Sequence, residues 1–535
     1  MPISLSLSLD PYAGPFTRRE AGHLLRRTTF GVTRARVDEA VALGPGAAVD
    51  RLLAAQPPLA PPLNHFFEDH PGVPVGATWV DAPRPPGVNV NAYQGQSLRT
   101  WHLRSYIRDE FSVAGRMALF WHNHFGVTES GDARLTYRYY ARLRDRGLGN
   151  FRRMVEETTV DPVMLRFLDG HTNRRGNPNE NYARELLELF TLGKGEQVAP
   201  GDYKTYTEDD VRAIANRLTG WLPRSPGEDA PAVGVFVANR HDPAPRQLSA
   251  RFAGAQLSAE GEEAYREVVA TVFAHPLAAH YLCRKLYRTF VHYDIDAAVE
   301  ASVIEPLAAR LRESDFEVAP VLRLLLASEH FFDVRERGAL VKSPLDYLAD
   351  LVNGLPFPKT PTTPGDNSAL EAEYRLYFYF YNQLPAMLMD LKSPPSVAGW
   401  KAWYQSPQYH RTWINASTLA HRTNIADVIV RRHRRDRGND YRLELLPFIA
   451  TFDNPADPND LLAELAERLL SEPLAPEQLA ALKEILIPGL PDFEWTIEYN
   501  HHLDDPDDED LRRSVRQKVH DVTYALVTSP EYHLY

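Results

Sequence analysis

The sequence predicts a mainly α fold: a large, multi-helix, non-bundle architecture with long proline-rich loops and at most a small β element. Three observations lead to this prediction. Helical periodicity recurs along most of the chain, and capping residues bound many of the periodic stretches. The 42 prolines gather between these stretches, where they favour stiff connections of varied length. Strand-like alternation is confined to one short run, Val233–Ala238.

Size and charge narrow the class of protein further. The chain has 535 residues, of which 44% are hydrophobic and 24% charged, as expected for a folded protein with a large core. Its net charge of −12 provides no basic field for nucleic acid, so we expect no nucleic-acid partner. No apolar run approaches the roughly 20 residues that cross a bilayer, so we expect no membrane span.

Two further features bear on compartment and redox chemistry. Cys283 is the single cysteine, which excludes an intramolecular disulfide and a cysteine-rich zinc site. The first 20 residues lack a basic segment followed by a continuous apolar one. We therefore find no evident signal peptide and predict a cytoplasmic protein.

The helical stretches divide the chain into three predicted regions. Residues 15–350 form a main helical domain that carries the candidate site and contains an irregular insertion at about 222–257. Residues 351–412 form an aromatic and proline-rich loop region with one helix. Residues 413–535 form a C-terminal helical region packed on the main domain.

Capping patterns justify individual helices in the main domain. Thr17 and Glu20 are spaced as a capping box, in which each side chain accepts the other residue's free backbone N–H. Thr207–Asp210 caps a later helix. Asp161 precedes Pro162 and a short apolar run, which predicts another helix start. We expect helices to begin at these three places.

The stretch Asn177–Gly193, NPNENYARELLELFTLG, predicts the central helix. Asn177 is a good N-cap, Pro178 takes the first helical position, Glu180 completes a capping-box pattern and Gly193 follows the last turn. We therefore expect one helix over the whole stretch.

This helix places a polar strip beside its apolar face. At about 100° per residue, Asn181, Glu185 and Glu188 fall on one strip roughly 60° wide. Arg184 flanks the strip and can reach Glu180 or Glu188 at i±4. Two carboxylates and an amide in this register suit a cation, a sugar or a partner's basic side chain; they also suit a solvated salt-bridge face. If Glu185 is buried, it needs a cation and is a candidate acid, base or ligand.

A second polar group lies in Phe120–Phe125, FWHNHF. The residues before it are apolar almost all round, so we expect His122 and His124 to be buried and hydrogen-bonded. On a regular helix the two imidazoles point about 160° apart, whereas an extended backbone would let both ligate one metal. The alternatives are a divalent metal held by His122, His124 and Glu185, or two histidines with structural roles.

Several other residues are candidates for substrate binding. His241 and Asp242 form a loop pair that can orient an imidazole or make a turn. Trp400 and Trp413 lie in a proline-flanked region where aromatic rings stack on sugars or pack a loop. Arg26 follows the first capping box and offers a cation.

Taken together, these segments resemble a large bacterial family, the domain of unknown function 1800. The matching segments run in the family's order along nearly the whole chain: His23–Gly31, Leu119–Phe125, Asn177–Gly193, Tyr206–Val211, Leu218–Trp221, Lys342–Pro344, Pro395–Trp400 and Trp413–Asn415. The resemblance implies a mostly helical protein, often exported, and often encoded beside a phosphatase/sulfatase-like protein of the domain of unknown function 1501 family. It implies no established reaction. This chain departs from the family pattern in two ways. It lacks an evident signal peptide, and after Arg240 its sequence is HDPAPR, where the resemblance implies a glycine soon after the acidic residue.

Two hypotheses for function follow. The first is a hydrolase-like enzyme, with or without a metal ion, acting on a polar substrate such as a glycan. Its catalytic residues would be Glu185, Glu188, His122 and Arg184, and Asn181, Arg26, His241, Asp242, Trp400 and Trp413 would bind substrate. The second is a non-enzymatic binding or assembly partner of the neighbouring phosphatase/sulfatase-like protein, in which the same polar groups fix helix packing.

Overall fold

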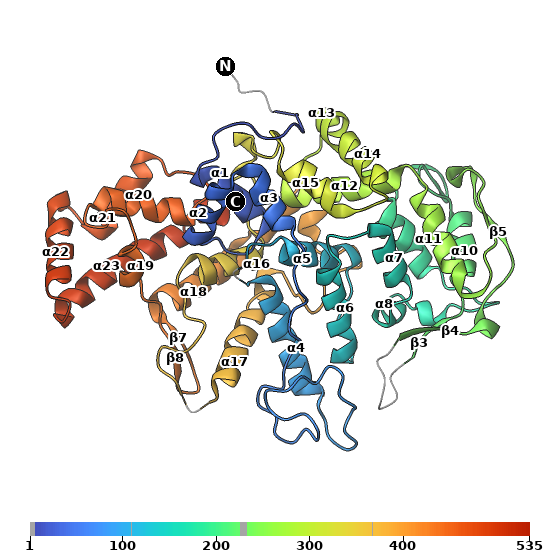
Figure 1. Ribbon diagram of the computed structural model, residues 1–535, viewed down its shortest axis with the longest axis horizontal. Helices are drawn as coiled ribbons and strands as arrows, with labels where there is room; N and C mark the ends of the chain where they lie inside the picture. The colour runs from blue at the N-terminus through green and yellow to red at the C-terminus, as the bar shows by residue number, and fades with distance from the viewer. Residues whose placement is uncertain (1–5, 109, 225–232, 366) are drawn as a thin grey trace.

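The computed structural model describes residues 6–108, 110–224, 233–365 and 367–535 (Figure 1). It confirms the mainly α prediction, because helices dominate and the strands form short antiparallel pairs. The pairs are β1 (Gln197–Ala199) with β2 (Asp202–Tyr203), β3 (Trp221–Arg224) with β4 (Val233–Phe236), β5 (Arg246–Gln247) with β6 (Gln256–Leu257), and β7 (Arg434–Asp436) with β8 (Asn439–Tyr441). Across the described residues, no helix combines the length and apolar character needed to cross a bilayer.

The first part of the chain folds into helices that surround the centre of the molecule in Figure 1. They are α1 (Arg18–Thr28), α2 (Arg34–Leu43), α3 (Pro45–Leu53), α4 (Asn91–Tyr106), α5 (Ala114–Phe125), α6 (Ala133–Asp145), α7 (Phe151–Thr159) and α8 (Pro162–Phe167).

The middle of the chain continues to the right end of Figure 1 and returns. Its helices are α9 (Asn181–Glu185), α10 (Glu208–Arg217), α11 (Ala264–Phe273), α12 (Leu277–Phe290), α13 (Ala297–Val299), α14 (Glu305–Glu313) and α15 (Val318–Leu326), with π-helical turns η2 (Leu186–Thr191) and η6 (Glu300–Ile304). The irregular insertion predicted at 222–257 contains β4, β5 and β6 and most of β3.

The last part of the chain extends to the left end of Figure 1, where α20 to α23 pack on one another. Its helices are α16 (Pro344–Ala349), α17 (Ala369–Tyr381), α18 (Ala416–Asp427), α19 (Leu446–Ile449), α20 (Pro458–Leu469), α21 (Pro476–Leu486), α22 (Asp492–Asp504) and α23 (Glu509–Val527), with π-helical turns η8 (Asp350–Gly354) and η12 (Val428–Arg432).

The structure confirms three of the predicted helix starts, those of α1, α8 and α10. Thr17 and Glu20 form the capping box of α1, and Thr207 and Asp210 form that of α10. Asp161 accepts hydrogen bonds from the backbone of the first turn of α8. Each satisfies N–H groups that a helix end leaves free, so these starts depend on neighbouring residues alone.

Two hydrophobic cores share helix α5. Met117, Trp121 and Phe125 belong to a core built from residues up to Phe332. Ala118 and Leu119, on the other side of the helix, belong to a core built mainly from residues after 344. Helix α5 is therefore buried all round, which explains why its sequence is apolar on every face.

The division of the chain at 350 and 412 stays a prediction.

A buried ion pair also joins the two cores. The guanidinium of Arg116, on α5, lies 2.7 Å from the carboxylate of Asp346, on α16. Arg116 also donates to the carbonyl oxygens of Arg26 and Thr29. This pairing holds the end of α1 and the start of α16 against α5.

Candidate functional site

The central segment differs from its prediction at both the start and the middle. The helix begins at Asn181, because Asn177 pairs with Arg174 in a backbone bridge and the Asn173 side chain accepts from the Asn179 backbone. The predicted cap at Asn177 is therefore wrong. From Leu186 the helix continues as the π-helical turn η2 and ends before Gly193, which follows the last turn as predicted and has a positive φ.

This π-turn leaves two carbonyl oxygens available to side chains from other helices. The Leu189 carbonyl accepts from the Tyr281 hydroxyl at 2.7 Å and from the Lys285 amine at 3.2 Å. The Phe190 carbonyl accepts from Nε2 of His124 at 2.9 Å. Helix ends leave carbonyls unpaired, and π-turns occur often at functional sites, so this is a natural centre for the candidate site.

His124 connects the π-turn to Lys285. Since the Phe190 carbonyl can only accept, Nε2 carries the hydrogen and Nδ1 is free to accept from the Lys285 amine at 3.1 Å. Burial, together with the nearby Lys285 charge, lowers the pKa of His124 well below its ordinary value. His124 is therefore a neutral imidazole with both nitrogens occupied.

The two predicted carboxylates lie near each other but have different surroundings. The Glu188 carboxylate accepts from the Tyr206 hydroxyl at 2.9 Å and pairs with the Lys194 amine at 3.2 Å. Among the described residues, no hydrogen bond or ion pair reaches the Glu185 carboxylate. Burial first, and then the Glu188 charge, raise the pKa of Glu185. The pair thus combines the anchored carboxylate of Glu188 with the free carboxyl group of Glu185, which holds its proton more tightly than an ordinary glutamate does.

Lys285 is a site residue that sequence reasoning missed. Burial and the neighbouring Arg288 lower the pKa of its amine to about 7. In the described part of the chain, no carboxylate lies within 4.0 Å of this amine. The available signal was the spacing of Tyr281, Lys285 and Arg288, which places these three polar side chains on one face of α12.

His122 and Asn123 face away from this centre and bind other backbone segments. Nε2 of His122 donates to the Leu391 carbonyl at 3.0 Å, and burial lowers the pKa of His122 to about 4. The Asn123 side chain accepts from the Trp400 backbone N–H at 2.9 Å. Gly399 allows this contact, because a Cβ there would lie 2.2 Å from Oδ1 of Asn123.

The predicted metal ligands do not converge. Helix α5 is regular through His122, Asn123 and His124, and each of the three side chains bonds a backbone group of a different segment. Within residues 6–108, 110–224, 233–365 and 367–535, no group of three or more His, Cys, Asp and Glu side chains is placed to hold one metal ion. His122, His124 and Glu185 therefore form no ligand cage here.

The remaining predicted residues lie in four separate places. Arg184 is held by two hydrogen bonds to Glu208 and one to Glu180, and Asn181 beside it is exposed. Arg26 lines a cavity between α1 and α20, described below.

His241 and Asp242 follow the β3–β4 hairpin. Nδ1 of His241 lies 3.0 Å from the Thr219 carbonyl, and Asp242 pairs with Arg246 at 2.5 Å. Both side chains are therefore held by neighbouring residues of the chain.

The rings of Trp400, Trp403 and Trp413 pack against one another. The Trp400 ring lies 5.3 Å from the His122 ring, and Trp413 lies 5.5 Å from Trp403, which in turn lies 5.8 Å from Trp400. Both Trp400 and Trp413 are buried, so their rings are covered by protein in this state.

The fold and the contacts around the π-turn η2 define a large α-helical protein with a buried polar centre where distant segments meet. A family model described as "Protein of unknown function (DUF1800)" matches residues 23–534, and the chain belongs to that family. Searches of curated proteins and of solved structures give no match. Three of the segments on which the resemblance rests are in contact: His124 binds Phe190 of the central segment, and Asn123 binds Trp400 of the loop.

Proposed function

We propose that this protein is a hydrolase-like enzyme that acts on a polar substrate such as a glycan, with Glu185 and Glu188 as its carboxyl pair. The observation that supports this most is the contrast between the two groups: Glu188 is anchored by Tyr206 and Lys194, and Glu185 has no partner among the described residues. Enzymes that hydrolyse glycosides use two carboxyl groups held in different protonation states.

The roles follow from the surroundings. Glu185 is the general acid, because burial and the Glu188 charge favour its protonated form. Glu188 is the fixed carboxylate that stabilises positive charge developing on the substrate or orients water. The proposal needs no metal, since His122 and His124 are bonded to carbonyl oxygens.

The test is turnover of a panel of oligosaccharides and aryl glycosides by the full-length protein, measured as new reducing ends or released phenol. Glu185→Gln should lower turnover by a factor of about 100 or more and leave the melting temperature nearly unchanged. Glu196→Gln, a nearby exposed carboxylate, is the matched control and should keep full activity. Full activity in Glu185→Gln would refute the assignment.

A second candidate function is a non-enzymatic partner of a neighbouring phosphatase/sulfatase-like protein of the domain of unknown function 1501 family. Helix α22 at the edge of the molecule exposes large apolar side chains, among them Phe493 at 56%, Ile497 at 47% and Leu503 at 56%. Exposed apolar groups gathered on one element mark protein contacts. Co-expression should then give a stoichiometric complex that the double variant Phe493→Ser, Ile497→Ser disrupts. Separate elution of the two wild-type proteins would refute this function.

A further inference from the structure

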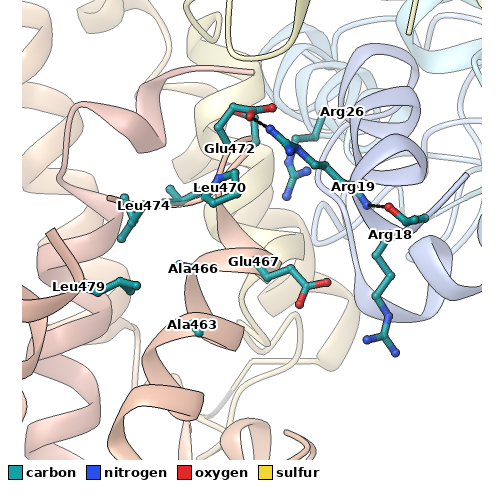
Figure 2. A pocket seen from close by; sticks show the side chains of 13 residues that line it. Arg18, Arg19, Arg26, Ala463, Ala466, Glu467, Leu470, Glu472, Leu474 and Leu479 are labelled. Carbon is teal, nitrogen blue, oxygen red and sulfur yellow. Dashed lines mark hydrogen bonds and ion pairs between the residues drawn. The ribbon is translucent and has the colours of Figure 1, made fainter. Parts of the chain in front are cut away.

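A cavity of about 390 Å³ lies between α1 and the helices α20 and α21. This volume falls within the range of small-molecule sites. Figure 2 shows its two sides: Arg18, Arg19 and Arg26 come from α1, and Leu470, Leu474 and Leu479 come from the opposite wall. The cavity is distant in sequence from the carboxyl pair and uses none of its residues.

The wall opposite α1 is mainly aliphatic. Leu470 follows the end of α20, Leu474 lies in the turn after it, and Leu479 lies in α21. Ala463 and Ala466, on α20, complete this side with small side chains (Figure 2). Such a surface favours a hydrocarbon chain, because burying it removes apolar area from water on both sides.

Arg26 differs from Arg18 and Arg19 in having no ion-pair partner among the described residues. Arg18 pairs with Asp38 at 3.0 Å, and Arg19 pairs with Glu472. Arg26 donates to the Arg468 carbonyl at 3.3 Å, and in the described part of the chain no carboxylate lies within 4.0 Å of its guanidinium. Burial lowers the pKa of Arg26, and the surrounding carboxylates of Asp350, Glu472 and Glu467 act against that shift.

The Arg26 guanidinium lies close to the backbone of its own helix at Gly22. A Cβ at Gly22 would stand 2.7 Å from an Arg26 terminal nitrogen, so Gly22 allows the Arg26 side chain to fold back along α1. A partly buried guanidinium without a carboxylate is costly, and an anion supplied from outside would offset that cost. Glu467 and Glu472 also line the cavity and disfavour a ligand with more than one negative charge.

We propose that this cavity binds an anionic amphiphile, a monocarboxylate with an unbranched aliphatic chain such as a medium-chain fatty acid. The carboxylate pairs with Arg26 and the chain lies along Leu470, Leu474 and Leu479. The site is independent of the proposed hydrolase activity, so either can fail without the other.

Isothermal titration of the full-length protein with decanoate tests the proposal. Decanoate should bind at one site, and affinity should rise about fourfold for each methylene added from hexanoate to decanoate. Arg26→Met replaces the guanidinium with an uncharged, unbranched side chain and should weaken decanoate binding at least tenfold without changing the weaker binding of decanol. Arg310→Met, at an exposed position of α14 outside the cavity, is the control for loss of one arginine charge and should bind decanoate like the wild type.

Two further variants keep the test informative if Arg26→Met folds poorly. Gly22→Ala displaces the Arg26 guanidinium and should weaken decanoate binding, and Leu474→Glu places a negative charge in the path of the chain and should abolish it. Absence of decanoate binding to the folded wild-type protein would overturn the proposal. Equal decanoate affinity in the wild type and in a folded Arg26→Met or Leu474→Glu variant would overturn it as well.

Discussion

Nε2 of His124 lies 2.9 Å from the carbonyl oxygen of Phe190, and this contact fastens helix α5 to the π-turn that carries Glu188. The same imidazole accepts from Lys285 through Nδ1. One buried histidine therefore connects three segments that are far apart in the sequence. Its neighbours His122 and Asn123 fasten α5 to two more.

We expect His124→Phe to lower the free energy of unfolding by about 2 kcal/mol. The replacement fills the space but leaves the Phe190 carbonyl and the Lys285 amine each without one partner, and such buried groups cost about 1–3 kcal/mol. Urea unfolding followed by circular dichroism measures the change. His501→Gln, at an exposed position, should change stability by less than about 0.5 kcal/mol. A His124→Phe variant as stable as the wild type would show that this contact contributes nothing to packing.

Gly399→Ala should destabilise the protein more than Gly87→Ala. Both glycines have a positive φ, which costs any other residue about 1 kcal/mol or more. A Cβ at Gly399 would also meet Asn123, whereas nothing lies within 4 Å of one at Gly87. The difference in melting temperature between the two variants therefore reports the close contact of Gly399 with Asn123. Equal melting temperatures would show that this contact does not restrict position 399.

Removing one side of the buried ion pair between Arg116 and Asp346 should be costly. Arg116→Met leaves the Asp346 carboxylate buried and unpaired, which typically costs about 3–5 kcal/mol. The double variant with Asp346→Asn should lose less than the sum of the two single losses, because its second change removes the stranded charge. Chemical unfolding of all four proteins measures this coupling. Strict additivity would mean that the two groups do not interact.

Lys285 should make stability depend on pH in the alkaline range. Its native pKa of about 7 lies below the ordinary lysine value of 10.5, so between these values the unfolded chain holds a proton that the native protein has released. Stability relative to a Lys285→Met variant should therefore rise as pH goes from about 7 to about 10.5 and stay flat below pH 6. Melting curves of both proteins across this range measure the difference. A difference that is constant with pH would show that Lys285 keeps an ordinary pKa.

The sequence predicted those parts of the fold that depend on neighbouring residues. The starts of α1, α8 and α10 follow from side chains within three positions of each cap. The predicted start at Asn177 failed, because the side chain of Asn173 organises the preceding turn instead. The π-turn was not predictable from its own residues, since Tyr281, Lys285 and His124 hold its free carbonyls from distant helices.

The candidate site was predicted in part for the same reason. Burial of His122 and His124 follows from the apolar residues around them, and their opposite directions follow from regular helix geometry. Their partners, the carbonyls of Leu391 and Phe190, depend on tertiary packing and carry no local signal. The proximity of Glu185 to Glu188 was evident from spacing, but the anchoring of Glu188 by Tyr206 was not.

Titration of the Glu185 carboxyl group by carbon-13 NMR is the most direct test of the proposed carboxyl pair. The Glu185 signal is assigned by its absence in Glu185→Gln. It should titrate above the ordinary glutamate value of 4.5 in the wild type and move back toward that value in Glu188→Gln, where the neighbouring charge is removed. A Glu185 signal that titrates at or below 4.5 in the wild type, or that is unchanged in Glu188→Gln, would contradict the account.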